Sequence, residues 1–96
     1  MKALRIALNS ITMIEIDSDL PALKKEIGDN ISTIGLKDGG VMIVDEDGMK
    51  KQHPHNDTAS YVSGQHVYGP ALIVGERGDE LDDVPDQYLV LLNLGE

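Results

Sequence analysis

Residues 41–44 (Val-Met-Ile-Val) are apolar at every position and lie between two turn signals. Before them, Lys37-Asp38-Gly39-Gly40 places an aspartate ahead of two glycines, which readily adopt the positive φ that a tight turn needs. After them comes a second turn, Asp45-Glu46-Asp47-Gly48. A short, wholly apolar run of this kind predicts a central strand that is covered on both faces. The chain is therefore expected to build a sheet around residues 41–45.

Other segments show the composition of strands. They are residues 3–8, 11–16, 31–36, 67–68 and 71–74. The first alternates, with Leu4, Ile6 and Leu8 on one face, and with the second it is expected to form an N-terminal hairpin. Residues 31–36 are expected to pair with 41–45. Gly69-Pro70 separates residues 67–68 from residues 71–74, since proline cannot donate to a β ladder.

Helix signals occur in three places. Residues 19–27 follow the caps Asp17-Ser18, carry Pro21 in the first turn and end before Gly28. Residues 58–62 are expected to form one or two helical turns capped by Asn56. Asp83 and Pro85 precede an apolar segment, residues 88–94, that fits either a C-terminal helix or a strand.

These segments predict one α+β domain over residues 1–96. We expect a mostly antiparallel sheet of four to six strands with two hairpins, and one or two helices on one face. A chain of 96 residues has room for a single core. The sequence has no cysteine, which excludes disulfides, zinc–thiolate sites and thiol catalysis. No N-terminal signal peptide and no apolar run of about 18 residues is present, so a cytoplasmic location is expected.

The net charge is −9, and lysine and arginine form no cluster. Free DNA or RNA is therefore not an expected partner, because such binding depends on basic side chains that neutralise phosphates. Residues 76–86 hold six acids and one arginine. They are interpreted either as a solvated loop with a helix cap or as a surface for a basic protein partner, through mimicry of a phosphate array. The residues expected to contact such a partner are Glu76, Asp79, Glu80, Asp82 and Asp83.

All three histidines, His53, His55 and His66, fall within fourteen positions. His53-x-His55 would present two imidazoles on one side of an extended segment, and Asp57 or His66 would add a third metal ligand. The alternative is a polar surface loop, and we assign no metal ligand and no cofactor from sequence. A triad of Ser60 or Ser63 with His66 and an aspartate lacks a nucleophile elbow, so no enzyme is expected.

Three short patterns occur in a fixed order: residues 41–48, Pro54-x-Asn56-x-x-Ala59, and residues 69–75 (Gly-x-Ala-Leu-Ile-Val-Gly). Their order resembles a family of small proteins of bacteriophages and mobile elements that is catalogued only as a domain of unknown function. The resemblance covers roughly residues 30–95. It implies a small α+β domain and no particular activity. For accessory proteins of this origin, it implies binding to a host component that is redirected or inhibited.

Two functions are expected. The first is a non-enzymatic, acidic accessory protein of phage type that binds and modulates a host protein, in the host cytoplasm and without contact to nucleic acid or membrane. The second is a protein that binds or sequesters a small nucleotide-like ligand or a metal through residues 53–61. Asn56 and Thr58 would bond that ligand, Tyr61 would stack on it, and His55 would contact phosphate or metal. Such a site would lie at the interface of a possible homodimer.

Overall fold

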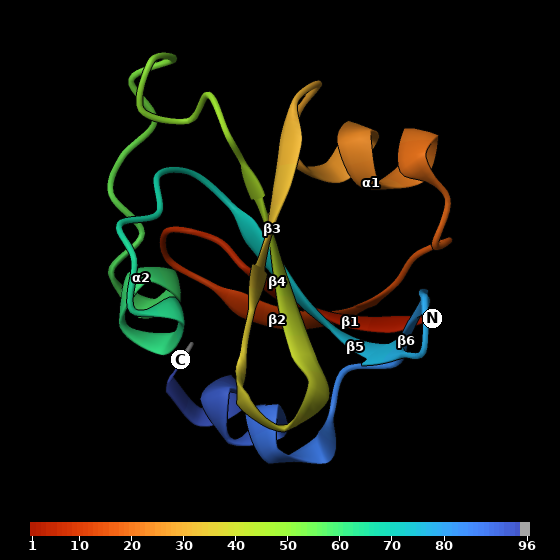
Figure 1. Cartoon of the computed structure of the whole chain (residues 1–96). Coiled ribbons are helices and arrows are strands. Elements are labelled where there is room, and N and C mark those ends of the chain that lie inside the picture. The colour runs from red at the N-terminus through yellow and green to blue at the C-terminus, as the bar shows by residue number, and fades with distance from the viewer. Residues whose placement is uncertain (95–96) are drawn as a thin grey trace.

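The computed structural model describes residues 1–94, apart from the side chains of Asp38 and Leu94. It confirms the α+β class, with a six-stranded antiparallel sheet at its centre (Figure 1). The strands are β1 (Lys2–Ile6), β2 (Ile11–Glu15), β3 (Ile31–Gly35), β4 (Gly40–Asp45), β5 (Ala71–Arg77) and β6 (Glu80–Asp82). The helices are α1 (Leu20–Ile27), α2 (Asp57–Ser63) and two 3-10 segments, η1 (Lys37–Gly39) and η2 (Asp86–Leu94).

The strand order is β2-β1-β5-β4-β3, and β6 pairs with β5. Strand β5 joins the two halves of the sheet, because Ile73 stands between Leu4 of β1 and Met42 of β4. Beyond Ile73, β6 takes the place of β1 along the same side of β5. The backbone N–H of Val84 then donates to the carbonyl of Lys2 at 2.9 Å, which fixes the hairpin against β1.

Apolar side chains form a layer on each face of the sheet. One layer includes Leu4, Ile6, Met42 and Ile73, covered by Ala59 of α2 and Leu91 of η2. The opposite layer includes Ala3, Val41, Ile43, Leu72 and Val74, covered by Leu23 and Ile27 of α1. The predicted central strand is thus buried on both faces. The helices lie on both faces rather than on one, because β4 and β5 are apolar on both sides and each side needs a cover (Figure 1).

Local details differ from the expectations. The cap of α1 is Asp19, whose side chain accepts the N–H of Ala22 at 2.9 Å. Residues 67–68 form no strand, and only an isolated bridge joins Tyr68 to His55. The expected loop over 76–86 contains β6, since β5 continues through Gly75 to Arg77. A side chain at Gly75 would overlap the carbonyl oxygen of Asp83. The glycine therefore allows the backbone after β6 to approach β5 closely.

The C-terminal segment is helical as far as Leu94, in the 3-10 form. The strand alternative for residues 88–94 is therefore wrong. Tyr88 anchors the segment, because its hydroxyl donates to the carbonyl of Lys37 at 2.8 Å. Its ring also fills the space that a side chain at Gly40 would occupy.

Candidate functional site

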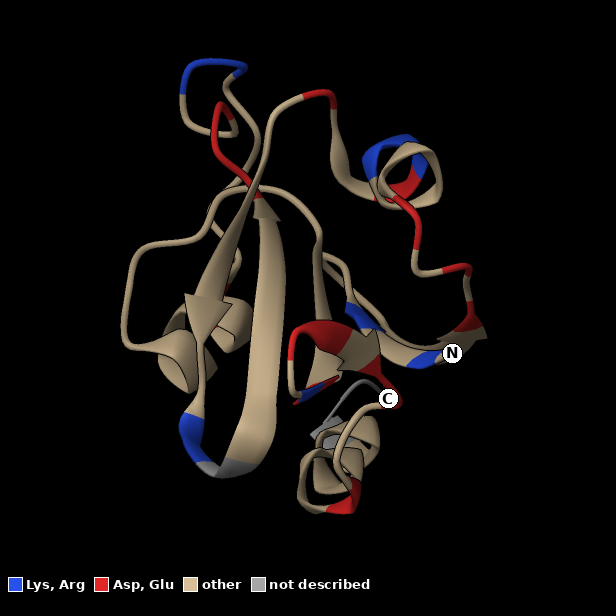
Figure 2. Cartoon of the chain, turned by 45° about the vertical axis from the view of Figure 1, so that its right-hand side comes forward, with Lys and Arg blue, Asp and Glu red and all other residues tan. Residues whose placement is uncertain are grey.

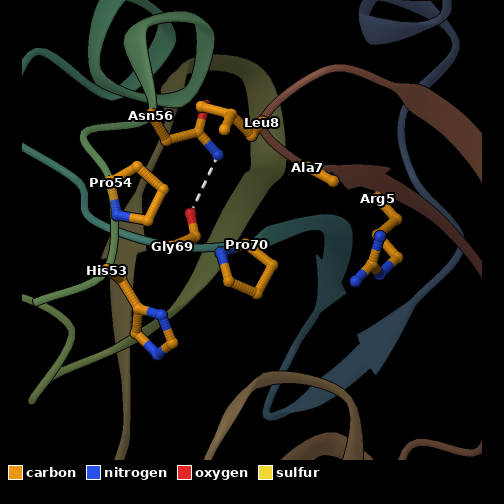
Figure 3. Close-up of a pocket in the computed structure, with 8 residues that line it drawn as sticks. All are labelled: Arg5, Ala7, Leu8, His53, Pro54, Asn56, Gly69 and Pro70. Carbon is orange, nitrogen blue, oxygen red and sulfur yellow. Dashed lines mark hydrogen bonds between the residues drawn. The ribbon is translucent and has the colours of Figure 1, made fainter. Parts of the chain in front are cut away.

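The segment that enters α2 is held by Asn56, which is 3% exposed. Its side-chain oxygen accepts the N–H of Ala59 at 3.0 Å, and this confirms the expected helix cap. Its amide group donates to the carbonyl of Ile6 at 3.0 Å. It also donates to the carbonyl of Gly69 at 2.9 Å, as Figure 3 shows. Both N–H donors are thus used inside the protein, and Asn56 joins α2 to β1 and to the segment before β5. The side chain is a structural clamp that offers no donor to a ligand.

His55 is the centre of a polar cluster beside α2. Its Nδ1 lies 2.6 Å from Oδ1 of Asp57, and its Nε2 lies 3.1 Å from Oγ of Ser60 and 3.2 Å from Nδ1 of His66. The ring packs edge-on against Tyr68, with the centroids 5.2 Å apart. About a third (36%) of the His55 side chain is exposed, so solvent reaches the cluster.

Ser60, His55 and Asp57 are arranged as hydroxyl, imidazole and carboxylate, a different triplet from the one drawn around His66 in the sequence. The Ser60 oxygen also accepts the backbone N–H of Val67 at 2.8 Å. This bond ties α2 to the chain that leads to β5. The observed contacts therefore give Ser60 a structural role.

The four predicted ligand residues are not brought together. His55 and Tyr61 border one open depression of about 400 Å³, and Tyr61 is 89% exposed. Asn56 is buried in the clamp, and Thr58 is half-buried outside this depression. The full lining is His55, Ser60, Tyr61, Gly64, Gln65 and His66.

His53 lies in a different place from His55. Its ring rests on Gly69, and its Nε2 is 3.9 Å from Oδ2 of Asp45. It borders a second hollow with Arg5, Ala7, Leu8, Pro54, Asn56, Gly69 and Pro70 (Figure 3). That hollow measures about 130 Å³, well below the roughly 300 Å³ at which ligand pockets begin.

Within residues 1–94, no three His, Cys, Asp or Glu side chains form a cluster suited to a metal ion.

The sequence did not reveal that Asp45 is buried. Its carboxylate accepts the backbone N–H of Asp47 and the ammonium of Lys51, both at 2.9 Å. Burial alone would raise the pKa of Asp45. The two hydrogen bonds and the positive charge of Lys51 outweigh burial, so the pKa lies below its ordinary value. The position of Asp45 at the end of an apolar strand was the available signal, but the sequence predicted only a turn beginning at this residue.

The five predicted partner-binding acids do lie together, four on the β5–β6 hairpin and Asp83 directly after β6; we call this whole segment the hairpin (Figure 2). All five side chains, Glu76, Asp79, Glu80, Asp82 and Asp83, are exposed. None of them takes part in an ion pair in the part of the chain that the structure describes. Two are held in place, because Asp83 accepts the N–H of Lys2 at 2.7 Å and Asp82 accepts the N–H of Asp83 at 2.8 Å.

The family model of a domain of unknown function, DUF3846, matches residues 1–93. The match includes the β1–β2 hairpin and α1, which the resemblance drawn from the sequence had left outside. Comparisons with curated proteins and with solved structures gave no match. No helix among residues 1–94 is long and apolar enough to cross a membrane.

Proposed function

The chain belongs to the DUF3846 family, a domain of unknown function, and we propose that it acts as a non-enzymatic binding protein for a basic protein. The binding surface is the β5–β6 hairpin. The observation that supports this most directly is the set of five exposed carboxylates on the hairpin, none of them in an ion pair within residues 1–94. Such a surface attracts lysine and arginine side chains and speeds their encounter.

The hairpin also has a fixed backbone, which favours binding over mere solubility. Strand β5 pairs with β1, β4 and β6, and Val84 is bonded back to Lys2. Two of its carboxylates, on Asp82 and Asp83, accept backbone hydrogen bonds. A partner would therefore lose little free energy in ordering this surface.

The partner class follows from charge. The net charge of −9 repels nucleic-acid phosphates, so the proposal is restricted to proteins. Accessory proteins of phages and mobile elements act on components of the host, and we extend that role to this chain, in the host cytoplasm. The basic target is then a host protein whose activity is modulated when the hairpin covers its cationic surface.

A charge-reversal experiment tests this function. Asp79→Lys with Glu80→Lys changes two hairpin acids whose side chains form no hydrogen bond or ion pair within residues 1–94. Asp29→Lys with Glu46→Lys changes the net charge equally, at the opposite end of β4. Proteins captured from host lysate by the wild type would be purified and titrated against both double variants.

We expect the hairpin variant to bind the captured partner at least about tenfold more weakly and the control variant to bind it like the wild type. Affinity of the wild type should fall steeply as salt is added. Equal losses in the two variants would mean that only net charge matters, and the assignment to the hairpin would then fail. It would also fail if no captured protein bound the purified wild type.

A further inference from the structure

We propose that His55 and His66 together bind one divalent transition-metal ion such as Zn²⁺, at the open depression beside α2. This site does not depend on the function proposed for the hairpin. The two facing atoms, Nε2 of His55 and Nδ1 of His66, are 3.2 Å apart. Zn–N bonds of about 2.0–2.1 Å in tetrahedral geometry place two imidazole nitrogens about 3.3 Å apart. The nitrogens already stand at the separation that one shared metal ion requires.

The carboxylate of Asp57 prepares His55 for this role. It lies 2.6 Å from Nδ1, so that nitrogen carries the proton and donates to the carboxylate. The lone pair of the imidazole is then on Nε2, the atom that faces His66. Metal-binding histidines commonly donate their second ring N–H to a carboxylate in this way, which orients the ring and makes the free nitrogen more basic.

A metal ion would also relieve competition at Nε2 of His55. This atom has one lone pair but two neighbours that can donate to it, the Ser60 hydroxyl at 3.1 Å and, in one of its tautomers, Nδ1 of His66 at 3.2 Å. When the ion binds, His66 carries its proton on its other nitrogen and gives a lone pair from Nδ1. Ser60 keeps its bond from Val67 and can turn its hydroxyl toward the Val67 carbonyl, which is 3.5 Å away.

The site would be an open one. Within residues 1–94 no third His, Cys, Asp or Glu completes a metal-binding group with the two facing nitrogens, since Asp57 is bonded to the other nitrogen of His55, so water completes the coordination. The depression of about 400 Å³ leaves space for that water. Coordination by two histidines and water favours Zn²⁺, Ni²⁺ and Cu²⁺ over Ca²⁺ and Mg²⁺, which prefer oxygen ligands.

The pairing differs from the one that the sequence suggested, which makes the proposal easy to test. The rings of His53 and His55 do not lie together in the structure. The His53 ring faces Asp45 and Gly69 instead. His53→Ala is therefore a matched control, because it removes one of the three histidines without touching the pair. His66→Ala is the decisive variant, since the His66 side chain is exposed and its loss should leave the fold intact.

The experiment is a calorimetric titration of the full chain, without a histidine tag, with Zn²⁺ alone. We expect one ion per chain in the wild type and in His53→Ala, and binding at least about tenfold weaker in His55→Ala and His66→Ala. Asp57→Asn should weaken binding about tenfold, because Asn cannot supply the charged partner of His55. In nitrogen NMR spectra of the imidazoles, Zn²⁺ should shift the signals of His55 and His66 and leave His53 unchanged.

Three results would overturn the proposal. They are the absence of Zn²⁺ binding to the wild type, unchanged affinity in His66→Ala, and loss of binding in His53→Ala. Circular dichroism of each variant checks that a loss of binding does not reflect unfolding. If His55→Ala fails to fold, the comparison of His66→Ala with His53→Ala still decides the question.

Discussion

The carboxylate of Asp45 lies 2.9 Å from the ammonium group of Lys51. The Asp45 side chain is fully buried, whereas the Lys51 side chain is 43% exposed. Asp45 is the last residue of β4, and Lys51 belongs to the turns that follow. The pair therefore ties residues 46–52 to the end of β4. Because only one partner is buried, the lysine keeps much of its hydration while the carboxylate gains a donor.

The stability of the protein should depend on pH through Asp45. Since its folded pKa is lowered, its contribution to stability is complete above the unfolded pKa of about 3.9 and is lost as pH falls through the folded value. Urea unfolding between about pH 2 and 7 should show the free energy of unfolding falling in acid. The fall should be smaller in Asp45→Asn, and identical curves for the two proteins would contradict the assignment.

Replacing the buried carboxylate should be costly at neutral pH. Asp45→Ala removes the acceptor of the Asp47 N–H and of the Lys51 ammonium, and hydrogen bonds to charged groups contribute about 1.5–3 kcal/mol. We expect the free energy of unfolding to fall by about 2–3 kcal/mol, measured with urea. Asp47→Ala is the control, because the one hydrogen bond of its carboxylate within residues 1–94 is a 3.4 Å contact with Asn30. The control should change stability by less than about 0.5 kcal/mol.

The clamp at Asn56 should not tolerate aspartate. Asn56→Ala loses a helix cap of about 1 kcal/mol and the donors to two carbonyls, for a total of about 3 kcal/mol. Asn56→Asp keeps the cap oxygen but turns a carboxylate toward the carbonyls of Ile6 and Gly69, so it should be at least as destabilising. At the exposed cap of α1, Asp19→Asn should change little. Thermal melts of the three variants provide the comparison, and a stable Asn56→Asp protein would show that the clamp is unimportant.

Two strand glycines should respond differently to alanine. A Cβ at Gly75 would overlap the carbonyl of Asp83, so Gly75→Ala should destabilise the protein by about 1–3 kcal/mol. Among the described residues, no atom lies within 4 Å of a Cβ at Gly35, on the edge strand β3, and Gly35→Ala should be neutral or slightly stabilising. Urea denaturation of both variants tests this, and equal effects would contradict the close approach of β6 to β5.

Much of the fold could be predicted because its signals are local. The wholly apolar run at 41–44 identified the central strand, and Asp38 with its two glycines identified the β3–β4 connection. Asn56 was correctly expected to cap α2. The placement of the helices was harder, because a pattern of apolar residues shows that a strand face is covered but not which helix covers it. The same limit applies to β6, whose acidic sequence has no strand propensity and pairs only because β5 runs past Gly75.

For the candidate functional residues too, some properties follow from the sequence and others only from the tertiary structure. The sequence alone determined the net charge, the lack of cysteine and the run of acids on residues 76–83, since these depend only on composition and order along the chain. Only the tertiary structure decided that His55 faces His66 rather than His53, and that Asp45 is buried beside Lys51. Both results depend on how α2 and the turns after β4 pack on the sheet. Distances across such packing are set by long-range contacts, which spacing along the chain does not specify.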